Sequence, residues 1–203
     1  MFIDLARTRR SIRRFADKPV EKEKVDQLIE AGLRSPSSKG STPWEFVVIA
    51  ESETLAQLST AKPKGAAFLK DAPLAIAVCA DSNITDVWVE DAAIAMTYLH
   101  LAATDLGLGS CWIQFRMRNF DESRTAGDRI QEILELPDGV EVLAILAIGY
   151  PAEEKPPHPA SSLKVGKVHF ERYGNKGIVR IRGFSADSGK RIWQGPGTVF
   201  LGI

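Results

Sequence analysis

The chain has 203 residues, of which 44% are hydrophobic and 26% charged, and this composition suits one globular domain with a substantial core. Its 26 basic and 26 acidic residues cancel, and a pI near 6.8 argues against a general nucleic-acid-binding protein. No apolar run approaches the roughly 18 residues of a membrane span, so we expect no membrane partner. The first residues do not read as a secretory signal, and we expect a cytoplasmic protein.

The segment RTRRSIRRF near the N-terminus places five arginines around Ser11. A guanidinium is a permanently charged fork that suits phosphate, and a nearby hydroxyl can add a hydrogen bond. On a helix, Arg9 and Arg13 would share one face, and Arg10 and Arg14 another. Taken alone, however, the cluster favours a solvated basic segment that pairs with the acidic residues of EKEK nearby.

The segment KPVEKEKVDQLIEAGLRSPSS predicts an amphipathic helix, since Val25, Leu28, Ile29 and Leu33 recur at helical spacing and Pro36 ends the pattern. The loop that follows, SPSSKGSTPWEF, is rich in small hydroxyl side chains. Such a loop exposes amides and hydroxyls that can bind a flat polar heterocycle or a sugar chain. A helix-terminating turn that happens to be rich in serine explains it equally well.

Strands and helices alternate along the rest of the chain, which indicates an α/β or α+β layered domain. The run APLAIAVCAD is apolar throughout and favours a central strand that is covered on both faces. The predicted strands span 44–50, 72–81, 110–115 and 141–151, and the predicted helices span 52–61, 86–107 and 124–136.

The helix predicted over 86–107 carries a wide, alanine-rich stripe that would let another backbone approach closely. The stripe favours a homodimer interface, and the alternative is the central core helix of a monomer. Its members are Val89, Ala92, Ala93, Met96, Leu99, Ala103 and Leu106.

The cysteines and histidines give no sign of a metal site. Cys79 and Cys111 lie in apolar strand-like runs, where we expect buried free thiols. The histidines have no metal-ligand spacing, and His100 is more readily explained as a packed or exposed helix side chain than as a ligand. After Tyr150 the chain becomes proline-rich and extended, and a hairpin is predicted between 178–184 and 190–194.

Taken in order, RRSIRRF, the helix after it, SPSSKGSTPWEFVVI, the long helix ending in LGLGSCWI, and AIGYPAEEKPP resemble the nitroreductase family of FMN-dependent oxidoreductases. The resemblance covers residues 3–173. It implies an FMN-binding domain over 1–173 and a C-terminal tail of unassigned role over 174–203. It also implies an α+β, three-layer fold, with a central mixed β-sheet flanked by helices, in an intertwined homodimer.

The resemblance also implies a set of FMN contacts. The Arg-x-Ser-x-Arg element would bind the phosphate and ribityl chain, and the Pro-Ser-Ser loop would reach the flavin from the partner subunit. The strand after LGLG would meet the flavin ring, with Gln114 the best hydrogen-bonding side chain. The implied residues are Arg9, Arg10, Ser11, Arg13, Ser37, Ser38, Lys39, Ile113, Gln114, Phe115, Lys155 and, as a weaker candidate, His158.

One departure from the family pattern concerns the loop, because the family often has Asn and Gln where this chain has Gly40 and Thr42. The implied activity is hydride transfer from NADH or NADPH through FMN to nitroaromatics, quinones or similar small acceptors, with no catalytic acid or base from the protein. The alternatives are a non-catalytic flavin-binding or storage protein and a flavin-dependent dehalogenase-like relative. The dehalogenase-like members usually carry a lid insertion, and this chain is short between residues 115 and 140.

Overall fold

A computed structural model describes residues 1–177, 179 and 181, and the chain divides into two compact units, 1–157 and 158–203. Apart from residues 179 and 181, the hairpin predicted over 178–184 and 190–194 lies outside the described residues. None of the helices described is both long enough and apolar enough to span a bilayer.

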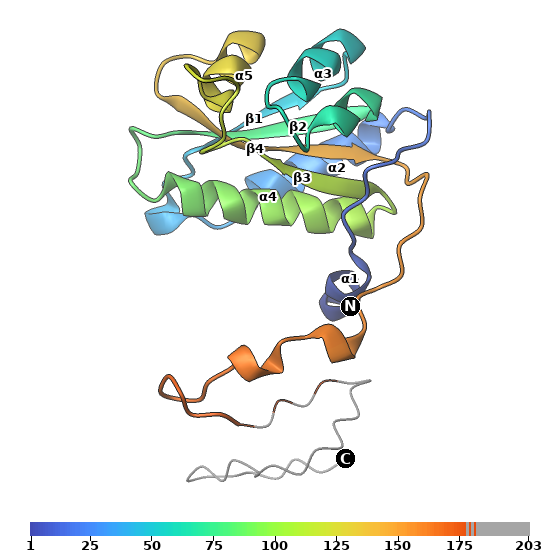
Figure 1. The fold of residues 1–203 in the computed structure, drawn as a ribbon, viewed down its shortest axis with the longest axis vertical. Coiled ribbons are helices and arrows are strands. Elements are labelled where there is room, and N and C mark those ends of the chain that lie inside the picture. Colours follow the sequence, from blue (N-terminus) through green and yellow to red (C-terminus); the bar gives the residue numbers. More distant parts are fainter. Residues whose placement is uncertain (178, 180, 182–203) are drawn as a thin grey trace. The chain divides into compact units, whose positions relative to one another are not determined.

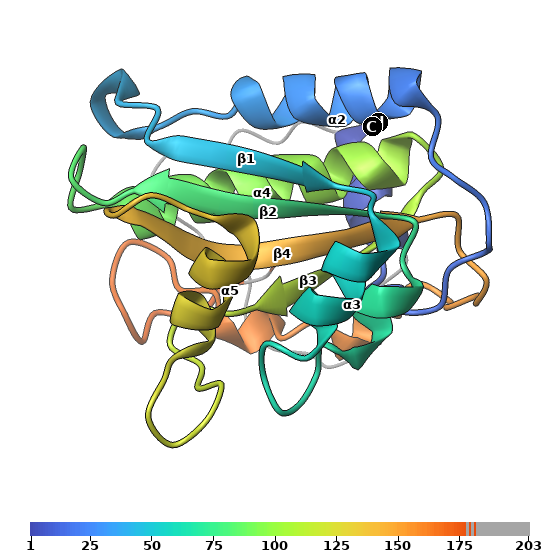
Figure 2. The same cartoon turned by 90° about the horizontal axis from the view of Figure 1, so that it is seen from above.

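A four-stranded sheet in the order β1-β2-β4-β3 forms the middle of the first unit (Figure 2). The two central strands are buried from Leu74 to Ala80 and from Val142 to Ile148, as the apolar run of the sequence predicts. The pairings between the four strands are antiparallel, and a single bridge between Ser11 and Ser110 adds parallel pairing. The strands are β1 (Trp44–Ile49), β2 (Leu74–Asp81), β3 (Gly109–Gln114) and β4 (Val140–Gly149).

Helices cover both faces of the sheet, which confirms the expected three-layer α+β fold (Figures 1 and 2). The helices α2 and α4 pack on one face around Leu28, Met96 and Leu99, while α3 and α5 pack on the other around Leu58 and Ile130. The helices are α1 (Phe2–Thr8), α2 (Lys22–Leu33), α3 (Ser52–Ser59), α4 (Trp88–Asp105) and α5 (Ala126–Leu134).

The alanine-rich stripe of α4 packs against the sheet of its own chain. Ala92, Met96, Leu99 and Ala103 are buried there. The small alanine side chains let the helix lie close to β2 and β4, so most of the stripe belongs to the core of this chain. The large apolar side chains that α4 leaves exposed are Ile94 and Tyr98, at 38% and 41%.

The arginine segment is extended from Arg9 to Phe15. The helical arrangement of its arginines that the sequence analysis considers is therefore wrong. The short helix α1 ends at Thr8, and the chain then runs beside β3, where the Ile12 N–H donates to the Ser110 carbonyl at 3.0 Å. Further along, the Ala152 N–H donates to the Arg14 carbonyl at 2.9 Å. Pairing with the sheet therefore satisfies backbone groups that a helix would otherwise satisfy, and it buries Ile12.

Two glycines allow this segment to approach the sheet. A Cβ atom on Gly109 would lie 2.8 Å from Ile12 Cγ2, and one on Gly149 would lie 3.0 Å from Phe15 Cδ1. Since real Cβ atoms essentially never lie closer than 3.0 Å to such atoms, a side chain at Gly109 would push the arginine segment away, whereas one at Gly149 would first meet Pro73 Cδ, at 2.6 Å, and would also crowd Phe15. The absence of a side chain at Gly109 in GLGS and at Gly149 in AIGY thus lets the arginine segment lie close to the sheet.

Candidate functional site

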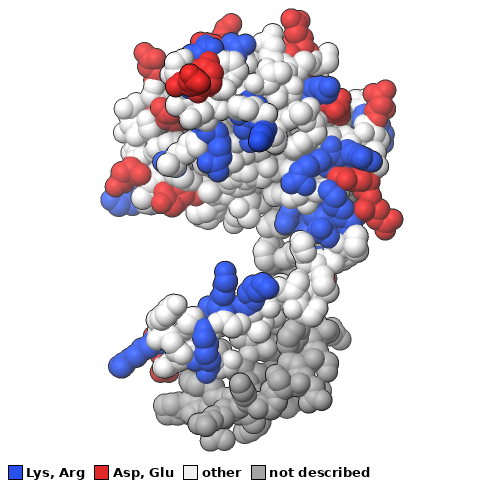
Figure 3. Space-filling model, viewed as in Figure 1, with Lys and Arg blue, Asp and Glu red and all other residues white. Residues whose placement is uncertain are grey.

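Three cationic side chains gather where the arginine segment crosses the beginning of β3. The Lys155 Nζ donates to the Ser11 carbonyl at 2.8 Å. Burial raises the pKa of the Cys111 thiol on β3, while the charges of Arg13, Lys155 and Arg9 act to lower it. The positive charges of all three side chains therefore affect the same thiol, that of Cys111 in the edge strand β3. Figure 3 shows basic side chains on the side of the first unit where the N-terminal segment runs.

One carboxylate is placed among these cations. Glu153 Oε1 accepts from the Arg13 backbone N–H at 2.6 Å and from Lys155 Nζ at 2.8 Å. These bonds, first that from Lys155, hold the pKa of Glu153 below its usual value. Because a single anion faces three cations, the cluster keeps a net positive charge and suits an anionic ligand.

Arg9 is tied to the protein core by a histidine. Its Nη1 lies 3.3 Å from His100 Nε2, and His100 Nδ1 lies 2.5 Å from Ser110 Oγ. His100 is 9% exposed and Ser110 is 2% exposed. Burial, and then the charge of Arg9, lowers the pKa of His100 to about 4, so the imidazole is neutral at pH 7.

The outer edge of β3 offers backbone groups to a ligand. The side chains of Ile113 and Phe115 are buried at 1% and 0%, so these two residues have little side-chain surface to offer. The Ser110 carbonyl points away from β4, toward Ile12. Since backbone groups alternate along a strand, Trp112 and Gln114 also direct their N–H and C=O groups to this edge.

The Gln114 amide is already engaged. Its Oε1 accepts from Trp112 Nε1 at 2.8 Å, and its Nε2 donates to the Arg116 carbonyl at 3.2 Å. The Gln114 carbonyl accepts from Lys62 Nζ at 2.7 Å, and Lys62 lies 5.0 Å from the centre of the Phe115 ring. Burial, ahead of the charge of Arg118, lowers the pKa of Lys62.

The Pro-Ser-Ser loop is held in place by α4. Asp91, 2% exposed, accepts from the Ser38 N–H at 2.8 Å and from Ser41 Oγ at 3.4 Å. Ser37 Oγ accepts from the Thr42 N–H at 2.9 Å. Lys39 has a positive φ of 53°, a left-handed conformation that is uncommon for a residue with a side chain.

The loop and the arginine segment meet different parts of α4 (Figure 1). Asp91 holds the loop and His100 holds Arg9, and nine residues of helix correspond to about 14 Å at 1.5 Å per residue. Within one chain, therefore, the structure does not bring Ser37, Ser38 and Lys39 together with the cation cluster.

Two other predicted residues have different surroundings. The Arg10 guanidinium donates to the Pro156 carbonyl, which ties the arginine segment to the residues that carry Lys155. His158 is exposed and is the first residue of the second unit.

In the part of the chain that the structure describes, no group of three or more His, Cys, Asp or Glu side chains is placed to hold a metal ion.

Sequence reasoning missed Lys62, Ser110 and the role of His100. Lys62 follows a helix in an irregular segment, and nothing in its local pattern indicates that it reaches the end of β3. His100 and Ser110 become neighbours only when α4 packs on the sheet. The one local pattern that could have indicated this contact is the short connection LGLGS, which places Ser110 a few residues after the end of α4.

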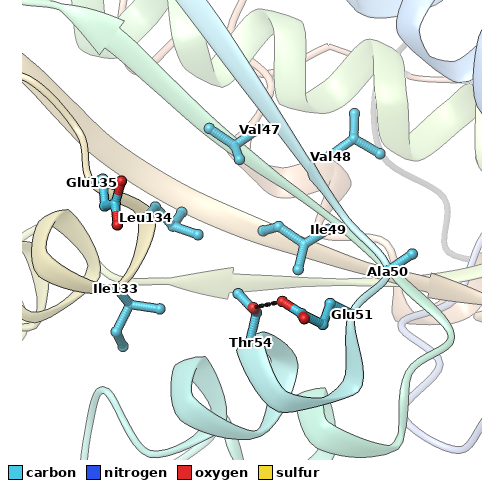
Figure 4. Close-up of a pocket in the computed structure, with 9 residues that line it drawn as sticks. All are labelled: Val47, Val48, Ile49, Ala50, Glu51, Thr54, Ile133, Leu134 and Glu135. Carbon is cyan, nitrogen blue, oxygen red and sulfur yellow. Dashed lines mark hydrogen bonds between the residues drawn. The ribbon is translucent and has the colours of Figure 1, made fainter.

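A separate pocket of about 280 Å³ lies at the opposite edge of the sheet (Figure 4). It is lined mainly by apolar residues of β1 and α5, and Thr54 Oγ1 of α3 donates there to Glu51 at 2.6 Å. Its lining includes acidic residues and no basic one, so it does not suit an anion. None of the predicted site residues lines it. The lining residues are Val47, Val48, Ile49, Ala50, Glu51, Thr54, Ile133, Leu134 and Glu135.

Comparisons with known proteins identify the family to which this chain is similar. A model of the nitroreductase family matches residues 6–150. A structure titled FMN-dependent nitroreductase, from Clostridium difficile R20291, is 48% identical with a TM-score of 0.83, and the match covers 84% of this chain and 99% of that one.

Two curated relatives are also similar over most of their length. A Methanothermobacter thermautotrophicus protein, provisionally named NADH dehydrogenase/NAD(P)H nitroreductase, is 34% identical over 174 residues, which are 84% of this chain and 87% of the relative. The NAD(P)H FMN reductase of Bacillus subtilis is 30% identical over 191 residues, covering 82% of this chain and 72% of the relative.

Proposed function

The chain belongs to the nitroreductase family, and we propose that it is an FMN-dependent oxidoreductase that uses NADH or NADPH to reduce small acceptors such as nitroaromatics and quinones. The observation that carries this proposal is that the charges of Arg9, Arg13 and Lys155 all act on Cys111 of β3, the open edge strand, while Lys155 bonds the Ser11 carbonyl between the two arginines in the chain. Relatives and a structural neighbour whose names include FMN reductase, NAD(P)H nitroreductase and FMN-dependent nitroreductase support it.

The cation cluster fits the phosphate of FMN. A phosphate monoester carries close to two negative charges, and guanidinium and ammonium groups form strong charge-assisted bonds with it. We propose that Arg9, Arg13 and Lys155 hold the phosphate, with the Ser11 hydroxyl as a further donor. Arg10, through its bond to Pro156, would keep Lys155 beside the segment.

The edge of β3 fits the polar rim of the flavin ring. The backbone groups of Trp112 and Gln114 point to this edge, and Lys62 lies against the end of the strand. We propose that these backbone groups hydrogen-bond the ring and so orient it. Ile113 and Phe115 would support the ring site from within the core. When bound, FMN supplies the redox chemistry, accepting a hydride from the nicotinamide and passing electrons to the acceptor.

We further propose a homodimer, in which the loop over Ser37, Ser38 and Lys39 serves the flavin site of the second copy. The distance along α4 between this loop and Arg9 supports a shared site. Exposed apolar side chains on α1 and α4 support an interface, since Phe2 is 68% and Ile3 is 46% exposed, along with Ile94 and Tyr98. The free thiols of Cys79 and Cys111 suit a reducing compartment, and we propose a cytoplasmic site of action.

The dehalogenase-like alternative gains no support from the fold. Residues 115–139, all of them described, hold α5 and short turns between β3 and β4. This stretch offers no lid-sized insertion over the proposed site.

Flavin analysis of the purified protein tests the proposal. The protein is denatured with heat or acid, and the released flavin is identified by chromatography and counted per chain. We expect one non-covalent FMN per chain. Release of FAD, or purification of a colourless protein that does not take up FMN, would refute the proposed function.

A further inference from the structure

We propose that His100 is a positioning residue, which holds the Arg9 guanidinium ready for the flavin phosphate without neutralising its charge. This inference rests on the proposed function, because it concerns the same phosphate site. It adds a residue of α4 that itself makes no proposed contact with the flavin.

The first support is the geometry of the contact. Arg9 Nη1 meets His100 Nε2 at 3.3 Å, and Arg9 itself is only partly exposed. His100 is 9% exposed in the C-terminal half of α4, among residues that pack on the sheet. A side chain anchored in a packed helix moves little, so one end of the guanidinium has a fixed attachment point.

The bonding roles of the imidazole are determined by its partners. Arginine has only donors, and Nε2 must therefore accept with its lone pair. The ring proton then lies on Nδ1 and is donated to Ser110 Oγ at 2.5 Å. This tautomer is the one in which both ring nitrogens have a suitable partner.

Ser110 connects the histidine to the arginine segment a second time. Its hydroxyl receives the His100 proton, and its carbonyl accepts from the Ile12 N–H at 3.0 Å. The residue that orients the ring therefore also fixes the backbone three residues after Arg9. Backbone and side chain of the phosphate-binding element thus share one buried anchor, since Ser110 is 2% exposed.

A neutral acceptor suits this role better than a carboxylate does. Lys155 is paired with Glu153 at 2.8 Å, and that pairing offsets part of its charge. An acidic residue at position 100 would likewise pair with Arg9 and compete with the phosphate for its charge. The imidazole takes up one N–H of Arg9 and leaves the positive charge and the remaining N–H groups for the anion.

Holding Arg9 in advance should favour binding of the flavin. Ordering a long side chain at a binding site has an entropic cost, and an arginine that is already ordered avoids much of it. The benefit is confined to ligands that carry the phosphate. Riboflavin has the same ring and ribityl chain without the phosphate, so it serves as the internal control.

The experiment titrates apo-protein with FMN and with riboflavin. His100→Leu keeps the bulk but removes both ring contacts, whereas His100→Gln keeps one acceptor and one donor. We expect His100→Leu to weaken FMN binding about tenfold, as for the loss of one hydrogen bond to a charged group, and to leave riboflavin binding nearly unchanged. His100→Gln should recover most of the loss, and Thr97→Ala on the exposed side of α4, whose hydroxyl bonds only the Ala93 carbonyl, should behave as wild type.

Two further variants keep the inference testable if His100→Leu fails to fold. Ser110→Ala removes the partner of Nδ1 and should give a smaller loss, again for FMN alone. Ser110→Ala combined with Arg9→Ala should bind FMN no more weakly than Arg9→Ala alone, because the Ser110 hydroxyl and His100 act through Arg9.

Equal losses for FMN and riboflavin, or independent effects of the Arg9 and Ser110 variants, would overturn the inference. Wild-type protein that binds both flavins equally well would instead overturn the proposed phosphate site, and with it the role of His100.

Discussion

Each cation of the proposed phosphate site has its own attachment to the protein. Arg9 contacts His100, Lys155 pairs with Glu153, and the guanidinium of Arg13 lies 5.9 Å from the centre of the Phe68 ring. The attachments differ in charge, since a neutral imidazole and a neutral ring leave the two arginines fully cationic. The arginines should therefore contribute more to anion binding than Lys155 does.

The two arginines after Ile12 give a direct test of the register. We predict that Arg13→Ala weakens FMN binding by about 1.5–3 kcal/mol, the cost of losing a hydrogen bond to a charged group. Arg14→Ala should cost little, because the Arg14 side chain is exposed and has no hydrogen bond or ion pair among the described residues. Flavin titration of both apo-proteins measures the difference, and equal losses would show that the register along RRSIRRF is wrong.

His100 also predicts a pH dependence of stability. Its pKa is about 4 in the folded chain and 6.5 for an ordinary, solvated histidine, so the unfolded chain binds a proton first as the pH falls. Its contribution to folding is therefore complete above pH 6.5 and decreases between pH 6.5 and 4. Since each unit of pKa difference corresponds to about 1.36 kcal/mol, the free energy of unfolding should fall by about 2 kcal/mol between pH 6.5 and pH 5.

The measurement compares wild type with His100→Gln by urea unfolding at pH 7 and at pH 5. The glutamine does not titrate, so the variant should lose less stability between the two values. An identical loss in both proteins would contradict a buried, neutral His100.

At the level of single residues, the site residues predicted from the sequence are mainly those whose charge and spacing form a recognisable pattern, and their contact with FMN stays a prediction. Arg9, Ser11 and Arg13 are close in the chain, and in an extended strand residues at even spacing share a side, as Arg9 and Arg13 would on a helix. His100 and Lys62 could not be assigned, because their partners come from distant segments. The neutral state of His100 results from burial, which only the packed structure reveals.

At the level of elements, the close approach of the arginine segment to β3 depends on Gly109. We predict that Gly109→Ala destabilises the protein by about 1–3 kcal/mol and weakens FMN binding, because the new methyl group would overlap with Ile12. Gly166→Ala is the matched control, since a Cβ atom there meets nothing within 4 Å. Urea unfolding and flavin titration check both effects, and an alanine at 109 with wild-type behaviour would refute the role of this contact.

Periodicity predicted most elements to within a few residues, as with α4, expected over 86–107 and observed over Trp88–Asp105. It was misleading for the arginine segment, where pairing with β3 outweighs any local helical preference. It also left the use of the alanine-rich stripe open, because a helix face packed on its own sheet and one packed on a partner have the same pattern. The burial of Met96 and Leu99 shows that the stripe lies in the core of this chain.

At the level of the whole molecule, the α+β architecture could be predicted because apolar strands alternate with amphipathic helices. The homodimer was predicted from the alanine-rich stripe and from the family resemblance, and the stripe loses most of its weight because Met96 and Leu99 are buried in the core of this chain. We predict a homodimer that dissociates when a charge is placed on the exposed apolar face of α4, as in Tyr98→Asp, and that releases FMN as it dissociates. Desolvating an unpaired carboxylate at an interface is costly.

Sedimentation of dilute holoprotein measures this effect. Gln57→Asp, which adds the same charge to α3 on the opposite face of the sheet, should remain dimeric and yellow. A stable wild-type monomer that retains its FMN would refute the shared site.

The most direct test of the central claim is an anaerobic titration of purified holoprotein with NADH and with NADPH, followed by the absorbance of the bound flavin. Because a nicotinamide and a flavin each exchange two electrons, one equivalent of at least one nicotinamide should bleach all of the bound FMN. Adding a quinone or a nitroaromatic should then restore the yellow colour. A flavin that stays oxidised with both nicotinamides would contradict the account and indicate a protein that binds FMN without using it.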